Sequence, residues 1–391
     1  MDFTIKQVTV SRVEGSGSGG DYFQQSKEHW LIGSLIANPM SGHDDYKKVR
    51  TSWGIDVLGS IVVEIETSNG TIGVATGFGG APAAWIINHH FNRFLVGQDA
   101  RNINLIWDQM YRASLPYGQA GLPIAAISAV DLALWDLLGK LRNEPVYNLI
   151  GGCSRSEISF YCTGPNAKAI KNMGFWGAKV PLPHGHYDGF DGVRKNYQFL
   201  KKQRSEIGSD FPLMVDCYMS LTPSYAVELA KACSDLDIYW WEEVLQPTDV
   251  EGYRIIRNAH PTLKWTTGEH NYTRHGFRKL IEERTIDVLQ PDVMWVGGLT
   301  ELLRIAAHAA AYDIPIIPHG SGPYSYHFIM SQNEQPRCEY VTSAPDGTYI
   351  RPVFGELFSD EPVPSNGKLK LSSKPGFGMT LNPSCKLVPF S

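Results

Sequence analysis

Residues 213–217 read Leu-Met-Val-Asp-Cys, residues 239–244 read Tyr-Trp-Trp-Glu-Glu-Val, and residues 264–269 read Lys-Trp-Thr-Thr-Gly-Glu. Each is a short, largely apolar run with an acidic residue near its end. This pattern is typical of a strand buried on both faces that carries a polar side chain at its carboxyl end. The acids Asp216, Glu242 and Glu269 are 26 and 27 residues apart, about the length of one strand and one helix. The regular spacing predicts repeated β-then-α units.

Five further apolar runs extend this pattern along the chain. The eight expected strands are 158–162, 177–180, 213–217, 239–244, 264–269, 288–292, 314–319 and 339–341. Most segments between them have helical periodicity, for instance 225–233 and 299–311. Eight such units in about 190 residues predict a (β/α)8 barrel with an irregular last unit. The alternative, a doubly wound open sheet, would need fewer strands.

The two ends of the chain have a different pattern. Strand-like alternation comes first, followed by helical periodicity, so residues 1–150 are expected to form an α+β domain. The expected strands are 3–8, 57–66 and 71–76, and the expected helices are 83–94, 103–113 and 123–140. Gly151-Gly152 marks the expected boundary, and the barrel is expected at 151–344. Residues 345–391 are too few for a third domain and are expected to pack back against the first.

The composition excludes several classes of protein. The 391 residues are 43% hydrophobic and carry 35 basic against 40 acidic side chains without a long run of either sign. This balance argues against a nucleic-acid groove or a membrane surface and favours a small-molecule partner. The six cysteines are widely spaced, which favours reduced thiols over disulfides or zinc ligands. With no apolar signal region at the N-terminus, we expect a cytoplasmic protein.

Three acids at neighbouring strand ends predict a metal site. Active sites of (β/α)8 barrels lie at the carboxyl ends of the strands, so Asp216, Glu242 and Glu269 should stand side by side. Converging carboxylates repel one another unless a cation joins them, and hard oxygen ligands suit Mg²⁺ better than zinc. We therefore predict one Mg²⁺ on these residues; the alternative is that each acid only caps a strand or pairs with a helix. Glu243 should support the site from outside it, because consecutive strand residues face opposite ways.

The next two strands end in Asp292 and His319. An aspartate that accepts the Nδ1 proton of a histidine fixes its tautomer and leaves Nε2 as a general base. We therefore predict a catalytic dyad beside the metal. Residues 15–20 contain the spacing GxGxxG, but no helical period follows, which favours a lid loop over a dinucleotide site.

Several motifs together resemble the mandelate-racemase subgroup of the enolase superfamily. They are the run Ile-Ser-Ala-Val-Asp-Leu-Ala-Leu-Trp-Asp-Leu-Leu-Gly-Lys at 127–140, the three acids, Gln-Pro-Asp at 290–292 and Gly-Gly-Leu-Thr at 297–300. Within the subgroup the sequence is most similar to the L-rhamnonate dehydratases. That similarity lies at 19–22, 38–41, 268–270, 318–321 and 374–378, and the resemblance covers nearly the whole chain.

The resemblance implies a barrel capped by a domain that both chain ends build, and Mg²⁺ on the three acids. It implies that Glu339 contacts the substrate or its enediolate and that Arg50 of the capping domain binds substrate. Lys179 is expected either to neutralise the substrate carboxylate or to pair with one of the three acids, and His270 is a candidate substrate contact. Phe23 stands where the family pattern has a histidine, and His29 follows six residues later, so these two positions bear on substrate recognition.

The second strand indicates the type of reaction. Racemases of the subgroup have Lys-x-Lys there, whereas residues 179–181 read Lys-Val-Pro. Because an opposing base is missing, a one-sided elimination is expected, with His319 taking the C2 proton. The resemblance implies that this elimination is the dehydration of an L-rhamnonate-like aldonate to a 2-keto-3-deoxy acid. The alternatives are another aldonate or aldarate as substrate, or a barrel that binds without catalysis. We expect a homo-oligomer.

Overall fold

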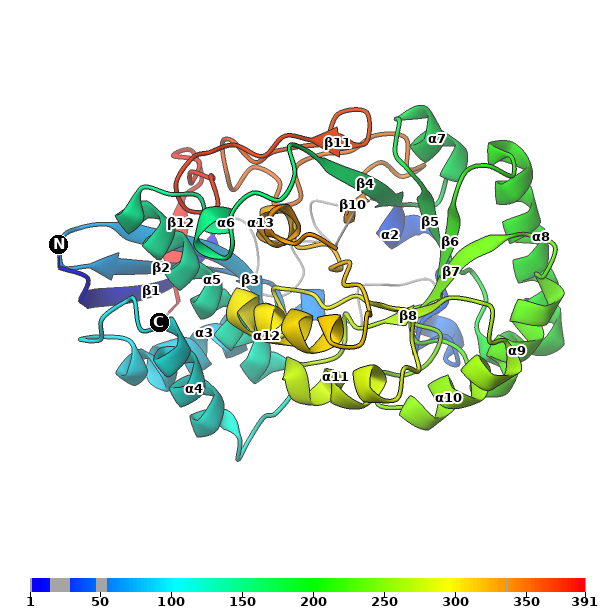
Figure 1. Ribbon diagram of the computed structural model, residues 1–391, viewed down its shortest axis with the longest axis horizontal. Coiled ribbons are helices and arrows are strands. Elements are labelled where there is room, and N and C mark those ends of the chain that lie inside the picture. The colour runs from blue at the N-terminus through cyan, green and yellow to red at the C-terminus, as the bar shows by residue number, and fades with distance from the viewer. Residues whose placement is uncertain (1, 15–28, 47–54, 335–336, 391) are drawn as a thin grey trace.

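A computed structural model describes residues 2–14, 29–46, 55–334 and 337–390. A capping domain with an antiparallel sheet lies beside a barrel of parallel strands (Figure 1). The expected fold class, a (β/α)8-type barrel with an α+β capping domain, is confirmed.

Both ends of the chain build the sheet of the capping domain. Its strand order is β12-β1-β2-β3, with neighbours antiparallel. The strands are β1 (Ile5–Val13), β2 (Ser60–Thr67), β3 (Ile72–Phe78) and, from the C-terminal tail, β12 (Leu387–Pro389). The helices are α3 (Gly80–His89), α4 (Ile103–Ser114), α5 (Leu122–Arg142) and α6 (Val146–Leu149). Shorter elements are α2 (Trp30–Gly33), η1 (Asp44–Tyr46), η3 (Ile55–Leu58) and η4 (Phe91–Phe94).

Helix α5 connects the capping domain to the barrel. Among the described helices it alone is long and apolar enough to span a membrane, but 89% of that stretch is buried inside the protein, as in a core helix. Asp136 of α5 accepts hydrogen bonds from the backbone N–H of Val74 at 2.8 Å and of Phe377 at 3.0 Å. The indole N–H of Trp135 donates to Thr300 Oγ1 at 2.9 Å. The run at 127–140 therefore joins the sheet, the C-terminal tail and the barrel.

The barrel strands run parallel in sequence order. They are β4 (Ile158–Thr163), β5 (Ala178–Pro181), β6 (Leu213–Asp216), β7 (Ile238–Glu242), β8 (Trp265–Thr267), β9 (Val288–Leu289) and β10 (Arg337–Val341), which pairs back with β4. The seventh expected strand, 314–319, joins its neighbour through two isolated parallel bridges, Leu289↔Ile316 and Asp292↔His319. All eight predicted runs therefore contribute to the barrel.

Helices follow the first seven runs. They are α7 (Ala167–Asn172), α8 (Gly189–Ile207), α9 (Pro223–Ala232), α10 (Val250–Ala259), α11 (Thr273–Glu282), α12 (Gly298–Ala310) and α13 (Pro323–Ser331), with η5 (His186–Asp188) before α8. No helix follows β10 within the described residues 342–390. Instead, β11 (Lys368–Leu369) pairs antiparallel with β4, which makes the last unit irregular.

Candidate active site

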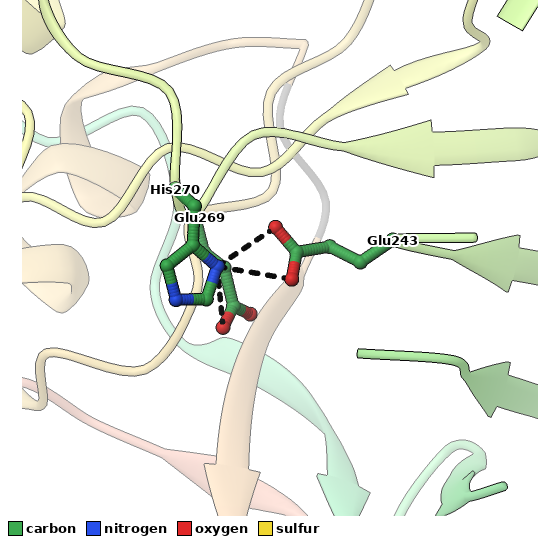
Figure 2. Close-up of side chains that lie close together, drawn as sticks. All are labelled: Glu243, Glu269 and His270. Atoms are coloured by element: carbon green, nitrogen blue, oxygen red, sulfur yellow. Dashed lines mark hydrogen bonds and ion pairs between the residues drawn. The ribbon is translucent and has the colours of Figure 1, made fainter. Parts of the chain in front are cut away.

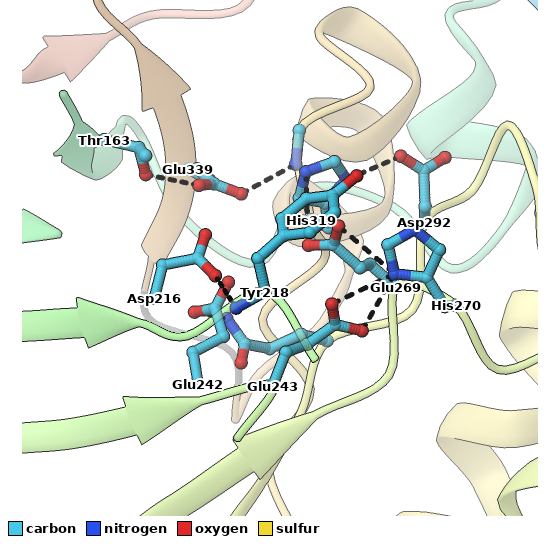
Figure 3. Close-up of polar contacts among 12 residues, drawn as sticks. Thr163, Asp216, Tyr218, Glu242, Glu243, Glu269, His270, Asp292, His319 and Glu339 are labelled. Atoms are coloured by element: carbon cyan, nitrogen blue, oxygen red, sulfur yellow. Dashed lines mark hydrogen bonds and ion pairs between the residues drawn. The ribbon is translucent and has the colours of Figure 1, made fainter. Parts of the chain in front are cut away.

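Acidic side chains gather at the carboxyl ends of the central barrel strands. Asp216 ends β6 and pairs in register with Glu242, which ends β7, and Glu269 follows β8 by two residues. Glu339 lies on β10 (Figure 3). All four residues are buried or nearly so, so their charges need partners.

Lys179 on β5 is the basic residue at the centre of this group. Its ammonium contacts Glu242 Oε1, lies 2.9 Å from Glu339 Oε1 and lies 3.5 Å from Asp216 Oδ2. Burial alone would lower the pKa of Lys179, but the three carboxylates raise it well above its usual value. Lys179 is therefore a charged ion-pair partner of two of the three predicted metal ligands.

The three predicted ligands have the electrostatics of a cation site. Burial raises the pKa of Asp216, Glu242 and Glu269, and neighbouring carboxylates raise it further, whereas Lys179 opposes this shift at Asp216 and Glu242 and His319 opposes it most at Glu269. Buried oxygen donors that repel one another form a donor set that fits Mg²⁺. The side chains of Asp216 and Glu242, however, are turned toward Lys179.

A second set of possible ligands shares Glu269. Among the described residues, Glu243, Glu269 and His270 form the group of three whose ligand atoms all lie within 4.8 Å of one another (Figure 2). Glu243 Oε1 and Oε2 each lie 3.0 Å from His270 Nδ1, and Glu269 Oε1 lies 3.4 Å from the same nitrogen. These contacts are those of an ion-paired histidine, and oxygen-only donors remain the better match to Mg²⁺.

The expectation that Glu243 faces away from the site is wrong. Its carboxylate points toward Glu269 and His270 (Figure 2). The cause is a backbone φ of +44° at Glu243, a left-handed conformation that ends the alternation of strand β7. Glu242 and Glu243 therefore both reach the carboxyl end of the barrel.

Asp292 and His319 form the predicted pair. Asp292 Oδ2 lies 2.7 Å from His319 Nδ1, while Asp292 Oδ1 accepts hydrogen bonds from Ser321 Oγ and the Met294 N–H, both at 2.7 Å. His319 Nε2 lies 3.4 Å from Glu269 Oε2. Burial lowers the pKa of His319, but Glu269 and the other nearby carboxylates raise it well above its usual value.

Glu339 is held by three donors. Its carboxylate accepts hydrogen bonds from Thr163 Oγ1 and, at 2.9 Å, from the Gly320 N–H, and it pairs with Lys179. Burial raises the pKa of Glu339, but Lys179 and His319 lower it to about 2. Glu339 is therefore an ionised group beside the dyad.

Two regions of the chain match family models. Residues 55–151 match the mandelate racemase / muconate lactonizing enzyme N-terminal domain, and residues 165–385 match the enolase C-terminal domain-like family. The chain belongs to the mandelate racemase / muconate lactonizing enzyme family.

Several known proteins are similar to this chain over nearly its whole length. Rhamnonate dehydratase from Gibberella zeae, solved complexed with Mg, is 60% identical with a TM-score of 0.96, over 99% of this chain and 96% of that chain. L-Rhamnonate dehydratase from Saccharopolyspora erythraea is 45% identical over 98% of both chains. The 3,6-anhydro-D-galactonate cycloisomerase from Zobellia galactanivorans is 27% identical with a TM-score of 0.78, over 97% of both chains. The resemblance inferred from the motifs is confirmed.

Of the capping-domain residues expected to take part in substrate recognition, the structure describes His29. Phe23, Arg50 and the glycine-rich segment 15–20 lie outside the described residues. His29 caps α2, where its Nδ1 accepts a hydrogen bond from the Leu31 N–H at 3.2 Å. The next residue, Trp30, donates its indole N–H to the backbone oxygen of Thr342, directly after β10, at 2.7 Å. His29 is thereby placed beside the rim of the barrel.

Sequence reasoning missed three polar residues that orient the site. Thr163 contacts Glu339, Ser321 contacts Asp292, and Gln290 donates its amide N–H to Glu242 Oε2 at 2.6 Å. Thr163 and Gln290 lie at or directly after the end of a barrel strand, so listing every polar residue there would have found them.

Proposed function

We propose that this protein is a Mg²⁺-dependent hydro-lyase that dehydrates L-rhamnonate to its 2-keto-3-deoxy acid. The observation that carries the proposal is the His319–Asp292 pair facing Glu269, in a chain similar along its whole length to rhamnonate dehydratases. A single base on one face of the substrate carbon is what a one-sided elimination requires.

The residues that would hold Mg²⁺ are Asp216, Glu242 and Glu269. When bound, Mg²⁺ draws charge from the substrate carboxylate and so makes the neighbouring C2 proton more acidic. The charged side chain of Lys179, already in contact with Asp216 and Glu242, supplies further positive charge for the substrate carboxylate. The site is therefore suited to an anionic substrate.

Burial lowers the pKa of His319, and the charge of Glu269 is the main influence that raises it. Because a bound cation would offset that charge, the neutral imidazole of His319 removes the C2 proton. Its Nδ1 is occupied by Asp292 at 2.7 Å, which leaves Nε2 to face the substrate and to accept the proton. Ser321 and the Met294 N–H hold the other oxygen of Asp292. The imidazole is thus fixed before the substrate enters.

The same imidazole then returns the proton. The protonated Nε2 of His319 donates to the 3-hydroxyl, the C3–O bond breaks, and one water leaves as the C2=C3 bond forms. The resulting enol takes up a proton at C3 and becomes a 2-keto-3-deoxy acid. Hydrogen and oxygen balance as the loss of one water.

Lys179 does not serve as an opposing base. Its three carboxylate contacts favour the charged form, and Pro181 stands where racemases of the subgroup have their second lysine. These features favour elimination over racemisation. A cytoplasmic location, a homo-oligomeric state and the domain boundaries at 150/151 and 344/345 stay predictions from the sequence.

The proposal is tested by incubating the purified protein with Mg²⁺ and a panel of aldonic and aldaric acids in D₂O. L-Rhamnonate should give the highest kcat/KM for keto-acid formation, with one deuterium at C3 of the product. A better aldonate or aldarate substrate would overturn the substrate assignment. Inversion at C2 with deuterium incorporation and without keto acid would indicate a racemase, and no reaction with any acid would favour a non-catalytic barrel.

A further inference from the structure

His270 is held by a carboxylate from the neighbouring strand. Glu243 follows the last residue of β7, and both of its oxygens lie 3.0 Å from His270 Nδ1 (Figures 2 and 3). Glu243 is 1% exposed, whereas the His270 side chain keeps 19% of its surface accessible. The imidazole is therefore reachable from the barrel mouth, and the carboxylate behind it is not.

The backbone of Glu243 is fixed in a costly conformation. A φ of +44° is a strained conformation for a residue other than glycine and persists only where the surroundings hold it. Here the Glu243 N–H donates to the oxygen of Thr266 at 2.9 Å, and the Glu243 carbonyl accepts from the Met219 N–H at 2.6 Å. Both neighbouring strand ends thus hold Glu243 in the orientation that brings its carboxylate to His270.

Two aromatic rings restrain the same imidazole. Tyr218, after β6, meets His270 edge-on with ring centroids 5.5 Å apart and an interplanar angle of 78°. Trp295, after β9, lies 5.3 Å away at 44°. Tyr218, Glu243 and Trp295, which follow three different strands, therefore fix the position and plane of the His270 ring. The carboxylate of Glu243 also determines that Nδ1 is the nitrogen on its side of the ring.

We propose that Glu243 is a positioning residue that holds Nδ1 of His270, so that Nε2 is the nitrogen presented to a hydroxyl of the substrate. This inference rests on the proposed function, in which a sugar acid occupies the barrel mouth. Two carboxylate–imidazole pairs then flank Glu269, whose Oε1 and Oε2 lie 3.4 Å from His270 Nδ1 and His319 Nε2 respectively. The Asp292–His319 pair moves the proton, and the Glu243–His270 pair binds the hydroxyl.

The kinetic test compares Glu243→Gln with Glu243→Leu in the Mg²⁺-loaded enzyme. Glutamine keeps an oxygen that accepts from Nδ1, and leucine removes it. The leucine variant should raise KM for L-rhamnonate about 10–100-fold with a much smaller effect on kcat, and the glutamine variant should stay within about threefold of the wild type. An unchanged KM in the leucine variant would overturn the proposal.

The matched control is Glu301→Gln. Glu301 is also fully buried and paired, with Arg274 at 2.8 Å and Arg304 at 2.9 Å, but it lies on α12 outside the barrel mouth. This variant should lower Tm while leaving KM and kcat unchanged. If Glu243→Leu behaves like this control, Glu243 is only structural.

A second readout needs no turnover. The ¹⁵N shift of His270 Nδ1, assigned by its loss in His270→Asn, should change in Glu243→Leu and be retained in Glu243→Gln. An unchanged shift in the leucine variant would overturn the proposal even if the enzyme is active. Absence of keto-acid formation by the wild type would refute the proposed function, while the shift would still report on Glu243. If the leucine variant does not fold, Glu243→Asp, which retracts the carboxylate by one methylene, is judged by the same readouts.

Discussion

Asp292 Oδ2 lies 2.7 Å from His319 Nδ1, and the two residues also form a parallel β-bridge between neighbouring runs of the barrel. The backbone pairing and the side-chain contact therefore fix the same geometry. Because the side chain of His319 is already held in one position, it loses little conformational entropy when the substrate binds.

Replacing His319 by asparagine should abolish turnover, because no other described imidazole is paired with Asp292. Keto-acid formation should fall about 10³-fold or more, while the Kd for Mg²⁺, measured by calorimetry, should be unchanged. His308→Asn, on the outer helix α12, is the control and should retain full activity. Substantial dehydratase activity in His319→Asn would refute its assignment as the base.

Removing the metal should abolish the activity of the enzyme reversibly. Asp216, Glu242 and Glu269 supply oxygen donors for the metal. Among the described residues, Lys179 is the cation that pairs with Asp216 and Glu242. Exhaustive dialysis against EDTA should eliminate keto-acid formation, and added Mg²⁺ should restore it. Activity that survives chelation would rule out the metal-dependent reaction.

Substitution of Lys179 by methionine should destabilise the fold. The change leaves Glu242 and Glu339 buried without their counter-charge, and breaking a buried pair in this way costs about 3–5 kcal/mol. Urea denaturation should show this loss in the free energy of unfolding, and added Mg²⁺ should recover part of it. Lys368→Met breaks the exposed pair with Glu157 and should change the same quantity by about 1 kcal/mol or less. Equal losses in the two variants would contradict the central role of Lys179.

A buried histidine outside the site, His327, should contribute to the loss of folding stability at low pH. Burial lowers the pKa of His327 to about 3, and its Nδ1 accepts a hydrogen bond from the Tyr147 N–H at 3.1 Å. The unfolded chain binds this proton near pH 6.5 and the folded protein does not, so stability is lost as pH falls below 6.5, by up to about 1.4 kcal/mol per pH unit.

His327→Asn removes this titration and keeps an oxygen that can accept from Tyr147. The free energy of unfolding, measured by denaturation between pH 7 and pH 4, should fall less steeply in the variant than in the wild type. Parallel pH profiles would show that His327 contributes nothing to acid sensitivity.

The sequence alone determined the barrel and the rim residues. Burial patterns and strand length are local properties, so eight apolar runs and their terminal acids could be located without coordinates. The recurrence of Asp216, Glu242 and Glu269 at intervals of one β-then-α unit then placed them on one rim. The pairing of Asp292 with His319 followed from the same spacing.

The tertiary structure decided how these side chains are partnered. Lys179 and Glu242 are 63 residues apart, and Thr163 and Glu339 are 176 apart, so no local pattern reports their contacts. The inward turn of Glu243 depends on a single backbone angle of +44°, which strand periodicity cannot predict. Closure of the barrel sets these contacts, because it brings distant strand ends into one buried volume where each charge must find a partner.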